Sequence, residues 1–108
     1  MRSDKKKRLE QAGWKVGSTQ DFLGLTDTEA ALVDMRVSLA RELKRQRRAH
    51  GVTQVTLARL VGSSQARVAK MEAGDPSVSL DLLVRTLLSS GSTAPAIGRV
   101  IARAVVNG

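Results

Sequence analysis

The segment TQVTLARLVGSSQARVAKMEAG, residues 53–74, predicts two short helices joined by a tight turn. Thr53 can cap the first helix through its hydroxyl, and Ser63 or Ser64 can cap the second. Gly62 can take a positive φ, so the chain can reverse there without a steric penalty. Two helices joined in this way cross at roughly 90–120°. The crossing leaves one side of the second helix exposed.

Apolar residues in this segment recur at positions that face the angle between the two helices. The predicted filling of the corner is Leu57, Ala58, Val61, Val68 and Met71. The outer side of the second helix, which we expect to run to Ala73, carries Gln65, Ala66, Ala69 and Lys70, with Arg67 beside it. The second helix therefore presents amide and basic groups to solvent.

Further helical signals flank the corner on both sides. A capping box over residues 26–29, with Thr26 as the cap, opens a long helix that Gly51 ends. Later helices are predicted over residues 80–89 and 94–105 because apolar residues recur there at helical spacing. The expected apolar face of the long helix consists of Leu32, Met35, Leu39 and Leu43. No stretch alternates as a strand does, so the chain is predicted to be all-α.

Length and composition exclude several classes of protein. The chain has 108 residues, enough for one domain, and 42% of them are hydrophobic. With no Cys and one His, we expect no disulfide, no thiolate or zinc site and no cofactor. The lone His50 has no nucleophile or base constellation around it, so we do not expect an enzyme. No apolar stretch approaches the ~18 residues of a membrane span, so no membrane partner is expected.

The charge of the chain points to an anionic partner. Eighteen Lys and Arg against ten Asp and Glu give a net charge of +8, which favours nucleic acid first and a membrane surface second. Residues 30–50 hold six of the basic and two of the acidic side chains. Because this helix adjoins the corner, we expect Arg45 and Arg48 to contact phosphate. The alternative is an ordinary solvated helix face.

The segment resembles the helix-turn-helix of the Cro/Xre family, to which phage repressors belong. The resemblance covers about Leu39 to Gly91 and rests on Thr53–Ala58, Gly62, Ser64–Gln65, Val68 and Met71–Gly74. It implies an all-α, five-helix, lambda-repressor-like helix-turn-helix domain with a short N-terminal extension. The expected domains are an extension over 1–29, a DNA-binding core over 30–91 and a C-terminal dimerisation helix over 92–108.

The resemblance implies roles for the second, recognition helix. Gln65 stands where the family places a base-reading side chain, and its amide can match adenine N6 and N7 in the major groove. Ala66 is expected against a thymine methyl, Arg67 on phosphate or a groove edge, and Lys70 on guanine or phosphate. The alternative for each is a solvated helix residue. Phosphate contacts at helix starts are expected from Gln54, Ser63 and Ser64.

Two further positions concern the frame of the recognition helix. The family pairs an Arg of the first core helix with the Glu that closes the recognition helix, here Arg47 and Glu72. We expect this ion pair to hold the two helices together. Asp75 departs from the basic or amide residues that many relatives carry after this helix, and its charge would repel phosphate. Ser77, Ser79 or helix-start amides would have to substitute there.

A narrower likeness extends over nearly the whole chain. Gly13–Val16, Asp21–Leu25 and Ser64–Leu80 are similar to HigA-like antitoxins. That likeness implies a homodimeric repressor of its own operon, bound to an inverted-repeat operator in double-stranded DNA. It also implies a small HigB/RelE-like ribonuclease toxin as partner and a cytoplasmic, nucleoid-associated location. The segment with Trp14 and Phe22, including a helical turn over 21–23, is expected to fold back on the long helix and to face the toxin.

Two alternatives to the antitoxin remain open from the sequence. One is a phage-type or host repressor of the same family that has no toxin partner. The other is a coactivator of the multiprotein-bridging type, which uses the same fold to contact the transcription machinery. A neighbouring toxin gene separates the first from an antitoxin, and sequence-specific DNA binding separates both repressors from the coactivator.

Overall fold

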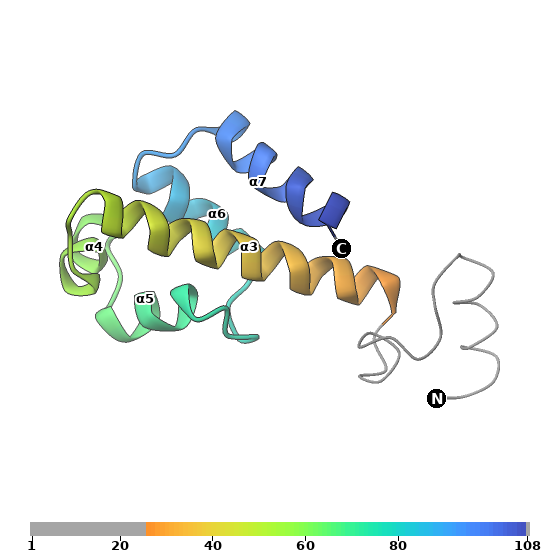
Figure 1. Cartoon of the computed structure of the whole chain (residues 1–108). Coiled ribbons are helices and arrows are strands. Elements are labelled where there is room, and N and C mark those ends of the chain that lie inside the picture. Colours follow the sequence, from red (N-terminus) through yellow and green to blue (C-terminus); the bar gives the residue numbers. More distant parts are fainter. Residues whose placement is uncertain (1–25, 108) are drawn as a thin grey trace. The chain divides into compact units, whose positions relative to one another are not determined.

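The computed structural model describes residues 26–107, which form α-helices and the connections between them (Figure 1). No strand occurs among the described residues, so the prediction of an all-α chain is confirmed. The five helices of this part of the chain are α3 (Asp27–Ala49), α4 (Gln54–Val61), α5 (Gln65–Glu72), α6 (Leu80–Ser89) and α7 (Ala94–Asn107). The expected turn over 21–23 and the roles expected of Trp14 and Phe22 lie outside the described residues.

The helices begin where the sequence predicts, because their caps are local. Ser64 Oγ accepts a hydrogen bond from the backbone N–H of Arg67 at 3.1 Å, so Ser64 and not Ser63 caps α5. Thr53 and Ser79 cap α4 and α6 in the same way, each bonding an N–H three residues further on. These bonds satisfy amide groups that a helix start leaves without an intrahelical partner.

Helix ends also follow local chemistry. Gly51 and Gly62, which follow α3 and α4, both have a φ of +68°. Few other residues adopt this left-handed conformation without strain, so glycine is needed to reverse the chain. The second helix of the corner ends at Glu72, one residue earlier than expected, and Ala73 is its C-cap.

The hydrophobic core contains side chains from all five helices and from Val78, in the connection between α5 and α6. Leu39 and Leu43 are buried, whereas Leu32, expected on the same face, is 40% exposed. A 23-residue helix is about 34 Å long, and the buried residues of α3 all lie between Leu39 and Leu43. The buried core cluster is Leu39, Leu43, Leu57, Ala58, Val68, Met71, Val78, Leu83, Leu87, Ile97 and Val100.

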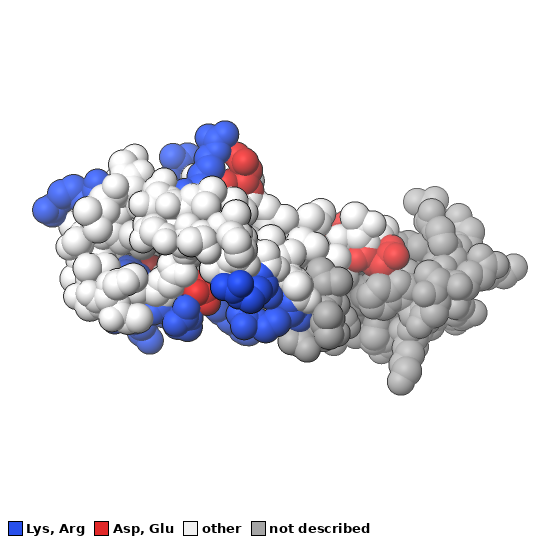
Figure 2. Space-filling model, turned by 90° about the horizontal axis from the view of Figure 1, so that it is seen from above, with Lys and Arg blue, Asp and Glu red and all other residues white. Residues whose placement is uncertain are grey.

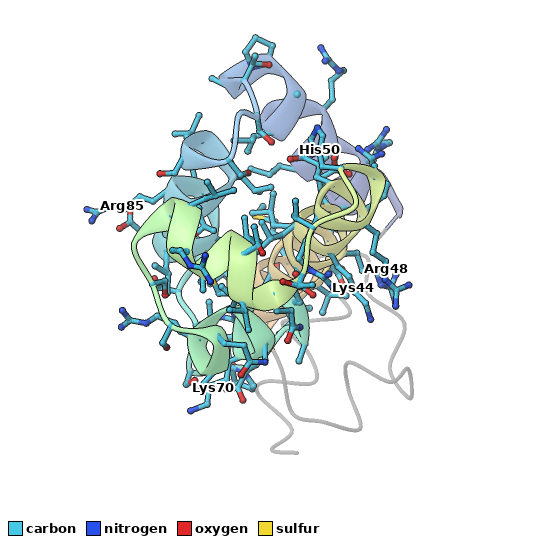
Figure 3. The ribbon with its side chains drawn as sticks, turned by 90° about the vertical axis from the view of Figure 1, so that its left-hand side faces the viewer. Lys44, Arg48, His50, Lys70 and Arg85 are labelled. Carbon is cyan, nitrogen blue, oxygen red and sulfur yellow. The ribbon has the colours of Figure 1, made fainter. Side chains whose placement is uncertain are left out.

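Helix α7 contributes its apolar face to this same core. Ile97, Val100 and Ala104 are all at least nine-tenths buried within the single chain. Helix α7 packs beside α6. Its cap was not predicted: Thr93 Oγ1 accepts from the N–H of Ala96 at 3.2 Å. Figures 1 and 3 show α7 on one side of α3 and α5 on the other.

None of the described helices is both long enough and apolar enough to cross a membrane.

Candidate nucleic-acid interface

Helices α4 and α5 form the predicted corner. Leu57 of α4 packs with Val68 and Met71 of α5 in the buried cluster. The opposite side of α5 is open: Gln65, Ala66, Arg67 and Lys70 are exposed. Figure 3, which views the domain from the side of α4 and α5, shows Lys70 pointing away from the body of the domain. The polar side of α5 is therefore accessible to a ligand and can insert into a groove of that ligand.

An ion pair ties α5 to α3. Arg47 Nε donates to Glu72 Oε2 at 2.6 Å, and Arg47 Nη2 donates to Glu72 Oε1 at 3.0 Å. Both side chains are largely withdrawn from solvent, at 12% and 3% exposure. Arg47 Nη1 also donates to the backbone carbonyl of Val52 at 2.9 Å. The hydrogen bond to Glu72 raises the pKa of the Arg47 guanidinium above its ordinary value. The pair holds the end of α3, the start of α4 and the end of α5 in one frame.

Two glutamine amides extend this frame to the surface. Gln54 Nε2 donates to Glu72 Oε1 at 3.1 Å, so the carbonyl oxygen of Gln54 points the other way. That oxygen accepts from Gln65 Nε2 at 2.8 Å. Gln54 and Gln65 are the first residues of α4 and α5, and the link joins the two helix starts. The buried Glu72 carboxylate thus orients the exposed Gln65 amide, with Gln54 as the link between them.

The sequence predicts separate contacts for these two glutamines and does not indicate the bond between them. The signal available was their position, because each is the first residue after a helix cap. In a helix-turn-helix corner the two helix starts lie close together, so two amides placed there can bond. Only the lengths of the turn and of α4 bring them within hydrogen-bond distance.

A hollow of about 300 Å³ lies beside α5, next to the loop that follows it. Among its lining groups, Ser64, Arg67 and Lys70 come from the α5 side and Ser77 from the loop. Hydroxyl, guanidinium and ammonium groups are donors that suit phosphate oxygens. The hollow is therefore the part of this surface with the chemistry of a phosphate site.

Ser63 and Asp75 flank α5 in the chain. The Ser63 hydroxyl is buried and has no hydrogen-bond partner among the described residues, so it is not presented on the outer side of α5. The Asp75 carboxylate accepts from the backbone N–H of Ser77 at 2.8 Å. Hydrogen bonding to Ser77 lowers the pKa of Asp75, and Lys70 adds to the effect. The acid after α5 is thus engaged by the loop itself.

The basic residues of α3 divide between two surfaces. Lys44 and Arg48 project outward side by side in Figure 3, and both are exposed. Arg45 lies elsewhere, in a groove lined by α3 and α7, with Nε donating to Glu42 Oε1 at 3.0 Å. Arg45 is therefore held by an acid of its own helix. Arg48 forms no ion pair with any described residue.

Within the described part of the chain, no group of three or more His, Asp or Glu side chains is placed to hold a metal ion.

A helix–turn–helix corner whose second helix exposes a polar side defines a class of DNA-binding domain. Residues 38–87, from α3 into α6, match the family model of a helix-turn-helix domain. The match supports an Xre-like helix-turn-helix DNA-binding protein. No curated protein and no solved structure matches the chain.

Proposed function

We propose that this protein is a sequence-specific transcriptional regulator that reads the major groove of DNA with α5. The observation that carries the proposal is the line of bonds from Arg47 through Glu72 and Gln54 to Gln65. A side chain that reads a base must be held in one orientation, because a freely rotating amide loses entropy on binding. The line of bonds supplies that orientation on the exposed side of α5.

The chemistry of the readout follows from which atoms are already bonded. Gln65 Nε2 gives one of its two hydrogens to Gln54, which leaves the other hydrogen and Oε1 free. A free donor beside a free acceptor matches adenine N7 and N6 in the major groove. Adenine is therefore the base proposed opposite Gln65. Ala66, next along the exposed side, is proposed to meet a thymine methyl.

Phosphate contacts are proposed on both sides of this readout. Ser64, Arg67 and Lys70 are proposed to hold one phosphate at the hollow beside α5. Gln54, at the start of α4, and Arg48, at the end of α3, are proposed to hold others. Arg45 is not proposed to contact phosphate, because its guanidinium donates to Glu42 in the groove between α3 and α7. These contacts position the protein without carrying sequence information.

The regulator is proposed to act as a homodimeric repressor. A two-fold dimer would place two copies of α5 in successive major grooves about 34 Å apart, on an inverted repeat. Because Ile97, Val100 and Ala104 are buried in the single chain, the interface would use other parts of α6 and α7. Leu88 on α6 is 47% exposed and is the apolar side chain proposed for its centre. Mass in solution for wild type and Leu88→Arg tests this, and a dimer that persists in the variant would move the interface elsewhere.

An antitoxin role is the finest part of the proposal and rests on the likeness of Gly13–Val16, Asp21–Leu25 and Ser64–Leu80 to HigA-like antitoxins. The proposed partner is a small ribonuclease toxin. A ribonuclease encoded beside this gene and neutralised by this chain would support the role. A gene without such a neighbour, with DNA binding intact, would leave a repressor without a toxin.

The decisive experiment is selection of DNA duplexes from a random library with the full chain. We expect an inverted repeat with one invariant A·T pair in each half-site. Gln65→Ala should bind the selected duplex less tightly and accept other bases at that pair. Arg99→Ala, an exposed change on α7, serves as the control. A chain that selects no sequence would overturn the proposal and favour a coactivator that contacts the transcription machinery.

A further inference from the structure

A second charged surface lies on the side of the domain away from α5. Helices α3 and α7 border a groove of about 510 Å³. Val37, Val100 and Ala104 are its apolar lining, and the latter two are 7% exposed. Figures 1 and 3 place α7 across α3 from α5, so DNA bound on α5 leaves this groove open.

Some charged side chains of this groove have hydrogen-bond partners among the described residues and others do not. Glu42 accepts from Arg45 Nε and from Gln46 Nε2, each at 3.0 Å. The hydrogen bond from Arg45 lowers the pKa of Glu42, and the positive charge of Arg103 across the groove contributes as well. Glu42, one of the two acids that line the groove, is therefore already bonded to residues of its own helix.

Two guanidinium groups of this groove form no ion pair with any described residue. They belong to Arg41 on α3 and Arg103 on α7, which line opposite walls and are exposed. Figure 2, which views the molecule from the side of α7, shows Lys and Arg side chains in several separate groups on this face, one of them larger than the others. Two planar groups of this kind favour carboxylate or phosphate oxygens.

We propose that the groove between α3 and α7 binds an acidic, amphipathic segment of a protein partner, with Arg41 and Arg103 holding its carboxylates. The apolar side of the segment would lie over Val37, which is the least buried of the three apolar lining residues. Recognition of one amphipathic segment between two helices is a common binding mode.

The lining of the groove favours a peptide over nucleic acid. Asp34 and Glu42 lie among the basic residues, and a continuous row of phosphates would have to pass both carboxylates. A peptide can place acids opposite Arg41 and Arg103 only, and a donor or apolar group opposite Asp34. The apolar lining also has no counterpart in a phosphate backbone. The proposal does not depend on what α5 binds.

The test uses the full chain, labelled with ¹⁵N, and a synthetic amphipathic peptide of about 15 residues with Glu on one face and Leu on the other. We expect saturable chemical-shift changes at Val37, Arg41, Val100 and Arg103. The double substitution Arg41→Glu/Arg103→Glu should weaken binding about tenfold or more, which is ~1.4 kcal/mol. The same peptide with Lys in place of Glu should then bind the double variant better than wild type.

The matched control is Arg59→Glu/Arg99→Glu. It makes the same change of charge at two exposed residues, one of them on α7, that do not line the groove. If the control weakens binding as much, the effect is bulk charge and the proposal fails. Shifts confined to α5, or no saturable shift, would also overturn it. Two other results would overturn the proposal. If a DNA duplex shifts the resonances of the groove residues, the occupant is nucleic acid. If these resonances shift with protein concentration alone, the occupant is a second copy of the chain.

Discussion

Glu72 accepts hydrogen bonds from both Arg47 and Gln54. One buried carboxylate therefore stabilises the domain and, through Gln54, orients the exposed amide of Gln65. The Glu72 side chain is 3% exposed, and all its partners come from other helices. A charge in such a place is tolerated only because it is paired and bonded. Changes at Glu72 should therefore affect both folding and recognition, which the following predictions separate.

Removing one member of the Arg47–Glu72 pair should strongly destabilise the fold. Glu72→Ala or Arg47→Ala leaves a buried charge without a partner, so we expect the free energy of unfolding to fall by about 3 kcal/mol. The double substitution should lose less than the sum of the two, because neither charge is then stranded. Chemical denaturation of the four proteins measures this, and strict additivity would show that the two side chains do not interact.

Gln54 and Gln65 should act as one reading unit. Gln65→Ala is expected to cost about 1–3 kcal/mol on the selected duplex and to relax preference at one base pair. Gln54→Ala should relax the same base pair, because it removes the acceptor that orients the Gln65 amide. The double variant should be little worse than Gln65→Ala in competition binding. Loss of preference at different base pairs in the two single variants would separate their roles.

Arg48 should contribute to affinity through charge alone. Arg48→Ala is expected to weaken binding to selected and unrelated duplexes alike. It should also reduce the slope of log K against log salt by about 0.9, the value for one phosphate contact. Titrations over a range of salt concentrations measure the slope, with Arg99→Ala as the control. An unchanged slope would place Arg48 outside the DNA contact surface.

Two glycines should respond to alanine in opposite directions. Gly62 has a φ of +68° with nothing within 4 Å of an added Cβ, so Gly62→Ala brings conformational strain and no clash. We expect a loss of about 1 kcal/mol, and a smaller loss for Gly62→Asn. Gly98 lies inside α7 with open space around it, so Gly98→Ala should gain about 0.5–1 kcal/mol. Thermal unfolding of the two variants measures both changes in stability. Equal changes for Gly62→Ala and Gly98→Ala would contradict the left-handed conformation at Gly62.

The Glu42 carboxylate should make stability depend on pH in the acid range. Its bond from Arg45 lowers its pKa from an ordinary value near 4.5, so the unfolded chain binds the proton more readily. The contribution is complete above that ordinary value and is lost as pH falls through the lower folded value. Below about pH 4.5, wild type should therefore lose stability faster than Glu42→Gln. Parallel curves for the two proteins would show that Glu42 has no such role.

Local features of the sequence were enough to predict the helices and the corner. Thr53, Ser64 and Ser79 cap their helices through bonds to residues three positions on, and Gly51 and Gly62 end theirs through their own backbone freedom. Each of these acts within one turn of helix, so the order of residues predicts it. The exception is the cap of α5, for which the sequence left Ser63 and Ser64 open and the structure shows Ser64. The exposed polar side of α5 follows in the same way from helical spacing around Val68 and Met71.

Other features depend on residues far apart in the chain and became visible only in three dimensions. Gln54 and Gln65 meet because α4 and the turn have particular lengths, and Arg45 lies in a groove because α7 crosses that part of α3. Leu32 is exposed although its spacing matches that of Leu39, because periodicity reports a helical face and not how far along the helix a partner extends. The apolar face of α7 likewise has the same sequence pattern whether it covers its own core or a second copy. Its burial within the single chain is set by where α6 and the connection at residues 90–93 direct it.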